Sequence, residues 1–191
     1  MAIAITSVDW EFISAREGGQ RLEAYVPEPE VSQSGVTVAT GVDLGQRSAS
    51  DIDNLDIPDT LKAKLKPYAG VIKQAAKKLL AENPLEITKT EADALDKAVK
   101  QKALDELIGR YDAATTGKKF SELPSGAQTV IASVAFQYGN LATETPKFWK
   151  MVTEQRWADA VAELRDFGDA YPTRRKLEAD LLQKALDQGQ L

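Results

Sequence analysis

Two residue types that often carry catalysis are missing from this chain of 191 residues, which contains no cysteine and no histidine. Without cysteine there are no thiol nucleophiles and no disulfides. Without histidine there are no Ser–His–Asp triads and none of the usual zinc ligand sets. Carboxylate, hydroxyl, lysine and tyrosine chemistry remain, and the sequence implies no metal or organic cofactor.

The chain also lacks an excess of positive charge and any long apolar run. Its net charge is −5, which argues against nucleic acid as a partner, because binding to a phosphate backbone needs a basic face. No segment is apolar over the length that crosses a bilayer, so we expect no membrane insertion.

The N-terminal segment has none of the features of a Sec signal peptide. It reads MAIAITSVDWEF, with no basic residues and no long apolar stretch, and residues 1–5 are expected to be a frayed start. We therefore expect synthesis in the cytoplasm. A translocation domain in front of the first helix is not expected either, so any role outside the cytoplasm would need separate delivery machinery.

The length and the 43% share of hydrophobic residues allow one domain, or two small lobes, to bury a core. Thr88 and Glu91 have the spacing of a capping box, which predicts a long helix from 88 to about 112. The other predicted helices cover about 8–17, 51–55, 58–66, 68–80, 124–136, 145–152, 157–167 and 172–182, with a strand within 20–34 and a hairpin within 35–45.

A carboxylate at the end of the first predicted helix is the first candidate for catalysis. Glu17 precedes Gly18 and Gly19, and paired glycines after a helical pattern indicate a helix C-cap. The negative pole of a helix dipole favours the protonated form of a carboxyl group, and a general acid needs that form. The ordinary alternative is a solvated residue at a helix end.

The glycine-flanked segment that follows contains a hydroxyl and a second carboxylate. It reads GVTVATGVDLG and places Asp43 six residues after Thr37. If the hairpin folds back over the helix end, both side chains would face Glu17. Taken singly, each has an ordinary reading, with Asp43 as a turn residue and Thr37 as a strand residue.

These residues resemble the catalytic segment of phage-type lysozymes, and the pesticin-like branch of that superfamily most of all. In that branch a Glu is followed by a hairpin Thr and then by an Asp six residues later, as are Glu17, Thr37 and Asp43 here. In the phage enzymes the Asp precedes the hairpin Thr, whereas no Asp lies between Glu17 and Asp43 here. Weaker similarities follow in the same order, namely ITKTEADAL, FQYG, EQRWADAVAEL and RRKLEADLL.

The resemblance implies a lysozyme-like α+β fold, mostly helical, as a single catalytic domain over 1–191. A small N-terminal lobe with a β-hairpin would span about 1–86, a connecting helix about 88–112, and a helical C-terminal lobe about 113–191. It also implies muramidase activity on peptidoglycan glycan strands. Glu17 would be the acid, Asp43 would activate a water for an inverting reaction, and Thr37 would assist.

Three further residues are assigned to substrate binding by the resemblance. Gln137 and Tyr138, in the FQYG segment, would line the cleft, and Arg174 corresponds to an Arg that pairs with the catalytic Glu. The ordinary alternatives are a packing aromatic for Tyr138 and a surface helix residue for Arg174.

The biological role is open at this point. A phage or prophage endolysin, a secreted antibacterial effector with an immunity protein, and a toxin's enzyme domain would share this chemistry. We expect a monomer. Two alternatives are a wall-binding or interaction protein without catalysis on the same fold, and an unrelated helical protein with an accidental motif.

Overall fold

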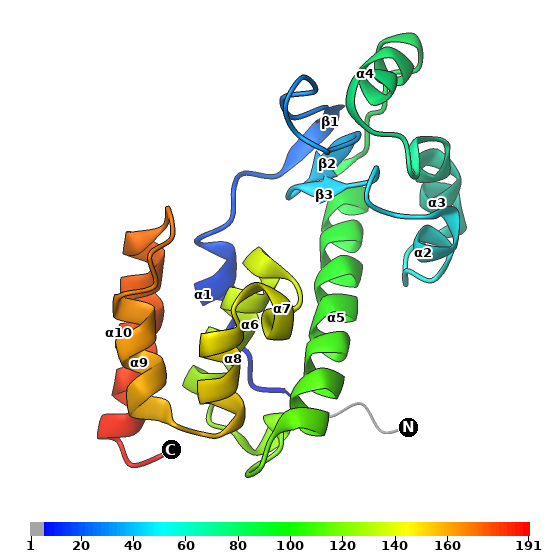
Figure 1. The fold of residues 1–191 in the computed structure, drawn as a ribbon. Coiled ribbons are helices and arrows are strands. Elements are labelled where there is room, and N and C mark those ends of the chain that lie inside the picture. The colour runs from blue at the N-terminus through cyan, green and yellow to red at the C-terminus, as the bar shows by residue number, and fades with distance from the viewer. Residues whose placement is uncertain (1–5) are drawn as a thin grey trace. The chain divides into compact units, whose positions relative to one another are not determined.

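The computed structural model describes residues 6–191, so the frayed start expected for residues 1–5 lies outside the described residues. The chain divides into two compact units (Figure 1). The sheet unit is Glu17–Lys102, and the helical unit is the described part of Met1–Arg16 together with Ala103–Leu191. The boundary falls within the long helix α5, so the predicted lobe limits stay a prediction.

The sheet unit contains a three-stranded antiparallel sheet in the order β1-β2-β3. The strands are β1 (Arg21–Tyr25), β2 (Thr37–Ala39) and β3 (Val42–Asp43). β2 and β3 form the predicted hairpin, and β1 supplies the strand predicted within 20–34. In the hairpin, Thr37 pairs with Asp43 and Val38 with Val42. The mixture of this sheet with many helices confirms the α+β class.

Short helices and the first part of α5 complete the sheet unit. Its buried apolar residues come from β2, β3 and each of these helices, and they include Val38, Leu44, Leu61, Ala76 and Leu95. The helices are α2 (Ala49–Asp53), α3 (Asp59–Leu65), the 3-10 helix η1 (Lys66–Tyr68), α4 (Lys73–Glu82) and α5 (Lys89–Ala114).

Two local sequence signals placed helix ends as predicted. The Thr88 amide donates to Glu91 Oε2 at 2.8 Å and the Glu91 amide donates to Thr88 Oγ1 at 3.2 Å, which is the capping box at the start of α5. Pro67 ends α3 and forces the short η1 turn before α4, because proline has no amide hydrogen to continue a helix.

The helical unit is built around α6 (Ser125–Tyr138). Every residue of this helix from Ala127 to Ala135 is buried. α10 packs against both α6 and α9, and Figure 1 shows α9 and α10 side by side. The elements are α1 (Trp10–Ser14), η2 (Phe120–Glu122), α6 (Ser125–Tyr138), α7 (Leu141–Glu144), α8 (Pro146–Thr153), α9 (Trp157–Arg165) and α10 (Pro172–Asp187), with the second part of α5. None of the described helices has the length and hydrophobicity needed to span a bilayer.

The end of α1 differs from the prediction, because the helix stops at Ser14 and does not reach Glu17. The Arg16 amide donates to the Ile13 carbonyl at 3.0 Å, and the Arg16 guanidinium contacts the Phe12 carbonyl and lies 3.5 Å from the Phe12 ring centroid. These bonds satisfy the helix end without a left-handed glycine. The predicted glycine cap is therefore wrong. The effect of the helix dipole on Glu17 is predicted from a helix that reaches this residue, and it has no basis here because the effect decays within the last turn of a helix.

Candidate active site

Glu17 begins the sheet unit and forms an ion pair with α5. Its Oε2 lies 2.5 Å from Lys100 Nζ, and the two side chains are 17% and 21% exposed. The contact has the geometry of an ion pair and not of a directed hydrogen bond. A carboxylate and an ammonium group this little exposed interact more strongly than a pair on an open surface, because water screens them less. Sequence analysis gave Lys100 no role.

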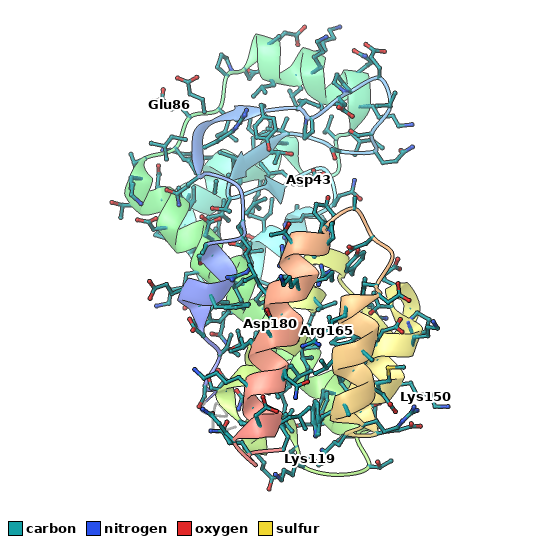
Figure 2. The ribbon with its side chains drawn as sticks, turned by 90° about the vertical axis from the view of Figure 1, so that its left-hand side faces the viewer. Asp43, Glu86, Lys119, Lys150, Arg165 and Asp180 are labelled. Atoms are coloured by element: carbon teal, nitrogen blue, oxygen red, sulfur yellow. The ribbon has the colours of Figure 1, made fainter. Side chains whose placement is uncertain are left out.

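Asp43, which is labelled in Figure 2, ends β3. One of its carboxylate oxygens accepts hydrogen bonds from two backbone amides. Asp43 Oδ1 accepts from the amide of Gly35 at 3.0 Å and from the amide of Gly45 at 2.8 Å. Among the described residues, no hydrogen-bond donor is bonded to Oδ2. One oxygen therefore sets the orientation of the carboxylate, and the other remains available to accept a proton.

Glycine is required at both of these flanking positions because the two backbones approach closely. A Cβ built on Gly35 would lie 2.5 Å from the Cα of Gly45 and 2.3 Å from the carbonyl oxygen of Val71. A Cβ on Gly45 would lie 2.6 Å from the Cα of Gly35. The glycines that the sequence suggested as turn residues thus serve to bring two amides to one carboxylate oxygen.

Thr37 lies directly opposite Asp43 in the β2–β3 pair, so the two side chains share one face of the sheet. Thr37 is 3% exposed, and its hydroxyl donates to the Gly35 carbonyl at 3.2 Å. Gly35 therefore links the two residues, because its carbonyl binds Thr37 and its amide binds Asp43. Thr37 and Asp43 are thus joined through one residue of the hairpin, and the role predicted for Thr37 stays a prediction.

The three predicted binding residues belong to the helical unit and join one buried network. Arg175, 2% exposed, is at its centre: its Nε donates to Asp169 Oδ2 at 2.9 Å, and its other nitrogens contact Glu178 and Gln137 Oε1. The hydroxyl of Tyr138 donates to the same Asp169 oxygen at 2.6 Å. Gln137 and Tyr138 are half-buried, and both are held in place by this network.

Arg174 is bonded within the same unit. Its Nε donates to Glu178 Oε1 at 3.1 Å, and its NH2 group donates to the carbonyl and hydroxyl oxygens of Ser133 at 2.9 and 3.1 Å. Glu178 is fully buried and also accepts from the Ser133 hydroxyl at 2.5 Å. The predicted pairing of Arg174 with Glu17 stays a prediction.

The network changes the acidity of two groups. Burial is the main cause that raises the pKa of Tyr138 to about 12, and the hydrogen bond to Asp169 adds to it. For Asp169, burial acts to raise the pKa, but hydrogen bonds from Tyr138, the Tyr171 amide and Arg175 together outweigh it and lower the pKa. Asp169 is therefore the charged partner in this network and Tyr138 the neutral one.

A pocket of about 650 Å³ lies beside this network, between the end of α9 and the start of α10. Asp169 and Arg175 line it together with apolar residues such as Phe167 and Pro172. The six residues predicted for the site do not line it. Among the described residues, no group of three or more acidic side chains is arranged to hold a metal ion.

The sequence contains little signal for the residues that support the candidates. Lys100, Arg175 and Glu178 are charged residues in helices, and their partners lie on other elements, apart from the contacts of Glu178 with Arg174 and Arg175 within α10. The one local signal was the spacing of Arg174, Arg175 and Glu178 in α10, which places two cations within three or four positions of one acid.

Comparisons with known proteins agree with the family resemblance of the sequence. A family model described as pesticin, a bacterial toxin homologue of phage lysozyme (C-terminal part), matches residues 7–158. Among solved structures, the muramidase domain of SpmX from Asticaccaulis excentricus is similar, with a TM-score of 0.53 and 14% sequence identity over 93% of this chain and 98% of that chain. No curated protein matches the chain. The structural similarity confirms the lysozyme-like fold, and at this identity it supports the fold alone.

Proposed function

Because the chain belongs to the pesticin family of phage-lysozyme homologues, we propose that it is a muramidase. It would hydrolyse the β-1,4 bond between N-acetylmuramic acid and N-acetylglucosamine in peptidoglycan. The observation that carries the proposal is the Asp43 carboxylate, which two backbone amides hold by one oxygen opposite Thr37. In the motif of this family the second carboxylate comes six residues after the hairpin Thr, and Asp43 stands at that position after Glu17 and Thr37.

The reaction proposed is single displacement with inversion. In its protonated form, Glu17 gives its proton to the glycosidic oxygen as the bond from that oxygen to the anomeric carbon breaks, and the ion pair with Lys100 belongs to the charged form that results. A water molecule attacks the anomeric carbon from the opposite face of the ring, and its proton passes to Asp43 Oδ2. Inverting enzymes keep their two carboxyl groups about 6.5–9.5 Å apart to admit this water.

Lys100 and Thr37 would support the two carboxylates in different ways. After proton transfer Glu17 is a carboxylate, and the ammonium group of Lys100 beside it would stabilise the charge that has formed. The Thr37 hydroxyl would help to orient Asp43 and its water through Gly35, to which both residues are bonded. No step in this scheme needs a cofactor.

Substrate binding is proposed for the helical unit. The half-buried ring of Tyr138 can pack against a sugar face. The amide nitrogen of Gln137 can donate to an N-acetyl carbonyl while Arg175 holds its oxygen. Arg174 would act through the buried network. The role in the cell would be lysis, as an endolysin or as an antibacterial effector delivered to the periplasm by a holin or a secretion system.

The direct test is Glu17→Gln, which keeps the size of the side chain and removes the acidic proton. Turbidity of purified peptidoglycan should fall with the wild-type protein and stay constant with the variant, since loss of general acid catalysis lowers the rate by about 10²–10⁴-fold. Circular dichroism controls for folding. Glu30→Gln is the matched control, because Glu30 contacts Gln74 and has no part in the mechanism.

The digestion products test the bond that is cut. Mass spectrometry should find reducing-end N-acetylmuramic acid with intact peptide stems, and NMR should find the α-anomer before mutarotation. Free stem peptides or 1,6-anhydro sugars would assign the protein to another enzyme class. A β-anomer would show a retaining reaction.

One observation favours a second candidate, a wall-binding protein without catalysis. Thr37 is 3% exposed, and its hydrogen bond to Gly35, like the two bonds to Asp43 Oδ1, stabilises the hairpin whether or not a reaction occurs. This candidate predicts that the wild-type protein sediments with insoluble peptidoglycan and leaves its turbidity unchanged.

A further inference from the structure

Asp96, in α5, makes three hydrogen bonds to two separate segments of the sheet unit. Its Oδ1 accepts from the Thr40 amide at 3.0 Å, and its Oδ2 accepts from the Thr40 hydroxyl at 2.7 Å. Oδ2 also accepts from Gln20 Nε2 at 2.9 Å. Asp96 is half-buried, and both of its oxygens are used in these bonds.

The two segments held by Asp96 are those that carry the proposed catalytic carboxylates. Gln20 comes three residues after Glu17, and Thr40 comes three residues before Asp43. A single side chain on a rigid helix therefore joins the chain near the acid to the chain near the base. Movement of Asp96 would change the position of one carboxylate relative to the other.

The turn that Asp96 binds is strained. Ala39 has a φ of 54° and Gly41 a φ of 75°, and Thr40 lies between them. An alanine in the left-handed region is rare, because its Cβ crowds the backbone, and such a residue persists only where neighbouring contacts hold it. The Thr40 amide, which directly follows Ala39, is one of the groups that Asp96 holds.

Asp96 belongs to a row of charged residues along one side of α5. Lys89, Asp93, Asp96 and Lys100 follow each other at intervals of four, three and four residues, which places them on one face of the helix. Asp93 Oδ1 accepts from Gln20 Nε2 at 3.0 Å, and Lys100 pairs with Glu17. This face thus holds the Glu17–Gln20 segment at Glu17 and at Gln20, and Asp96 is also bonded to the hairpin turn.

We propose that Asp96 is a positioning residue that sets the geometry between Glu17 and Asp43 by binding Gln20 and Thr40 together. The effect of Asp96 on catalysis rests on the muramidase function proposed above. The hydrogen bonds from the hairpin turn to Asp96 do not depend on that function, and they can be tested in a protein that has no activity.

The test compares Asp96→Ala and Asp96→Asn with Asp93→Asn. Asp96→Ala removes all three bonds, and Asp96→Asn keeps one oxygen acceptor and so serves if the alanine variant fails to fold. Asp93→Asn weakens the contact with Gln20 but leaves the turn untouched, which makes it the matched control. Kinetics on soluble glycan strands and amide hydrogen exchange by NMR are measured for each variant.

We expect Asp96→Ala to lower kcat by about tenfold to a hundredfold, since small displacements of reacting groups reduce rates to this extent. KM should stay within about twofold, because the sugar-binding residues are unchanged. The Thr40 amide should exchange fastest in Asp96→Ala, less fast but still faster than wild type in Asp96→Asn, whose one acceptor oxygen is uncharged, and at the wild-type rate in Asp93→Asn. Adding Ala39→Gly to Asp96→Ala should recover several-fold in kcat, because glycine adopts the positive φ without strain.

Two results would overturn the inference: Thr40 exchange unchanged by both Asp96 variants, or a loss of kcat in Asp96→Ala no larger than in Asp93→Asn. An inactive wild-type protein would refute the proposed function instead. The exchange rate of the Thr40 amide would then decide by itself whether Asp96 holds the turn.

Discussion

Asp43 has a structural role in the hairpin and a proposed catalytic role, and two substitutions can separate them. Asparagine at position 43 keeps an oxygen that can accept from the amides of Gly35 and Gly45, but it cannot take a proton from water. Alanine removes both the acceptor and the base. Asp43→Asn should therefore abolish the chemistry with little change in the hairpin, whereas Asp43→Ala should damage both.

The expected stabilities follow from the two hydrogen bonds. A hydrogen bond to a charged group contributes roughly 1.5–3 kcal/mol and a neutral one roughly 0.5–1.5 kcal/mol. Asp43→Asn exchanges two charged acceptor bonds for two neutral ones and should destabilise the protein by about 2 kcal/mol. Asp43→Ala loses both bonds and leaves the buried Gly35 amide without an acceptor, so about 3–4 kcal/mol is expected.

The assays are urea unfolding and the turbidity of purified peptidoglycan. Asp43→Asn should lower the rate by about 10²–10⁴-fold, the range for loss of a general base. Thr37→Ala should lose less activity than Asp43→Asn, because the hydroxyl would orient Asp43 and its water but would not accept a proton. Changing Glu23 or Glu28 to Gln should have little effect. An Asp43→Asn protein with wild-type activity would refute the assignment, above all if Glu28→Gln were inactive.

Further predictions concern the buried network and the hairpin. Glu178→Gln should destabilise the protein by about 3–5 kcal/mol, because it leaves Arg174 without a carboxylate partner and the buried Arg175 with Asp169 alone. Asp180→Asn on the exposed side of the same helix should change stability by less than about 1 kcal/mol in urea unfolding. The raised pKa of Tyr138 means that its contribution to stability is complete below pH 10.0, the unfolded-state value, and is lost as the pH rises through about 12. An alkaline absorbance titration of wild type against Tyr138→Phe should show this late ionisation, and Asp169→Asn should make it earlier. Gly45→Ala should lower both the unfolding midpoint and the activity, because its Cβ cannot fit without a backbone shift.

The sequence predicted the features of this fold that depend on neighbouring residues. The capping box at Thr88 and Glu91 and the break at Pro67 follow from bonds within a few positions of the chain. Thr37 and Asp43 are six residues apart, and a tight hairpin at this spacing places the two residues opposite each other on neighbouring strands.

The contacts that orient the candidate site join distant parts of the chain and left no pattern in the sequence. Lys100 is 83 residues from Glu17, and Asp96 is 56 residues from Thr40. In the sequence these residues are two more charges on a helix rich in charge. The wrong prediction at Gly18 and Gly19 has a local cause instead, since the Arg16 guanidinium contacts the Phe12 carbonyl and so supplies a side-chain contact to the helix end that propensity rules do not include.

The positions of the cations give a reason to separate the roles of the two units. Arg174, which is predicted to pair with Glu17, is bonded within its own unit to Glu178 and Ser133, and Glu178 is fully buried. Loss of those bonds would leave a buried charge without its partners, which is strongly unfavourable. Glu17 has a cation of its own unit in Lys100. Lys100 is therefore the better candidate to neutralise the charge on Glu17 after the proposed proton transfer. Arg174 is the better candidate to hold α6, the helix that carries Gln137 and Tyr138.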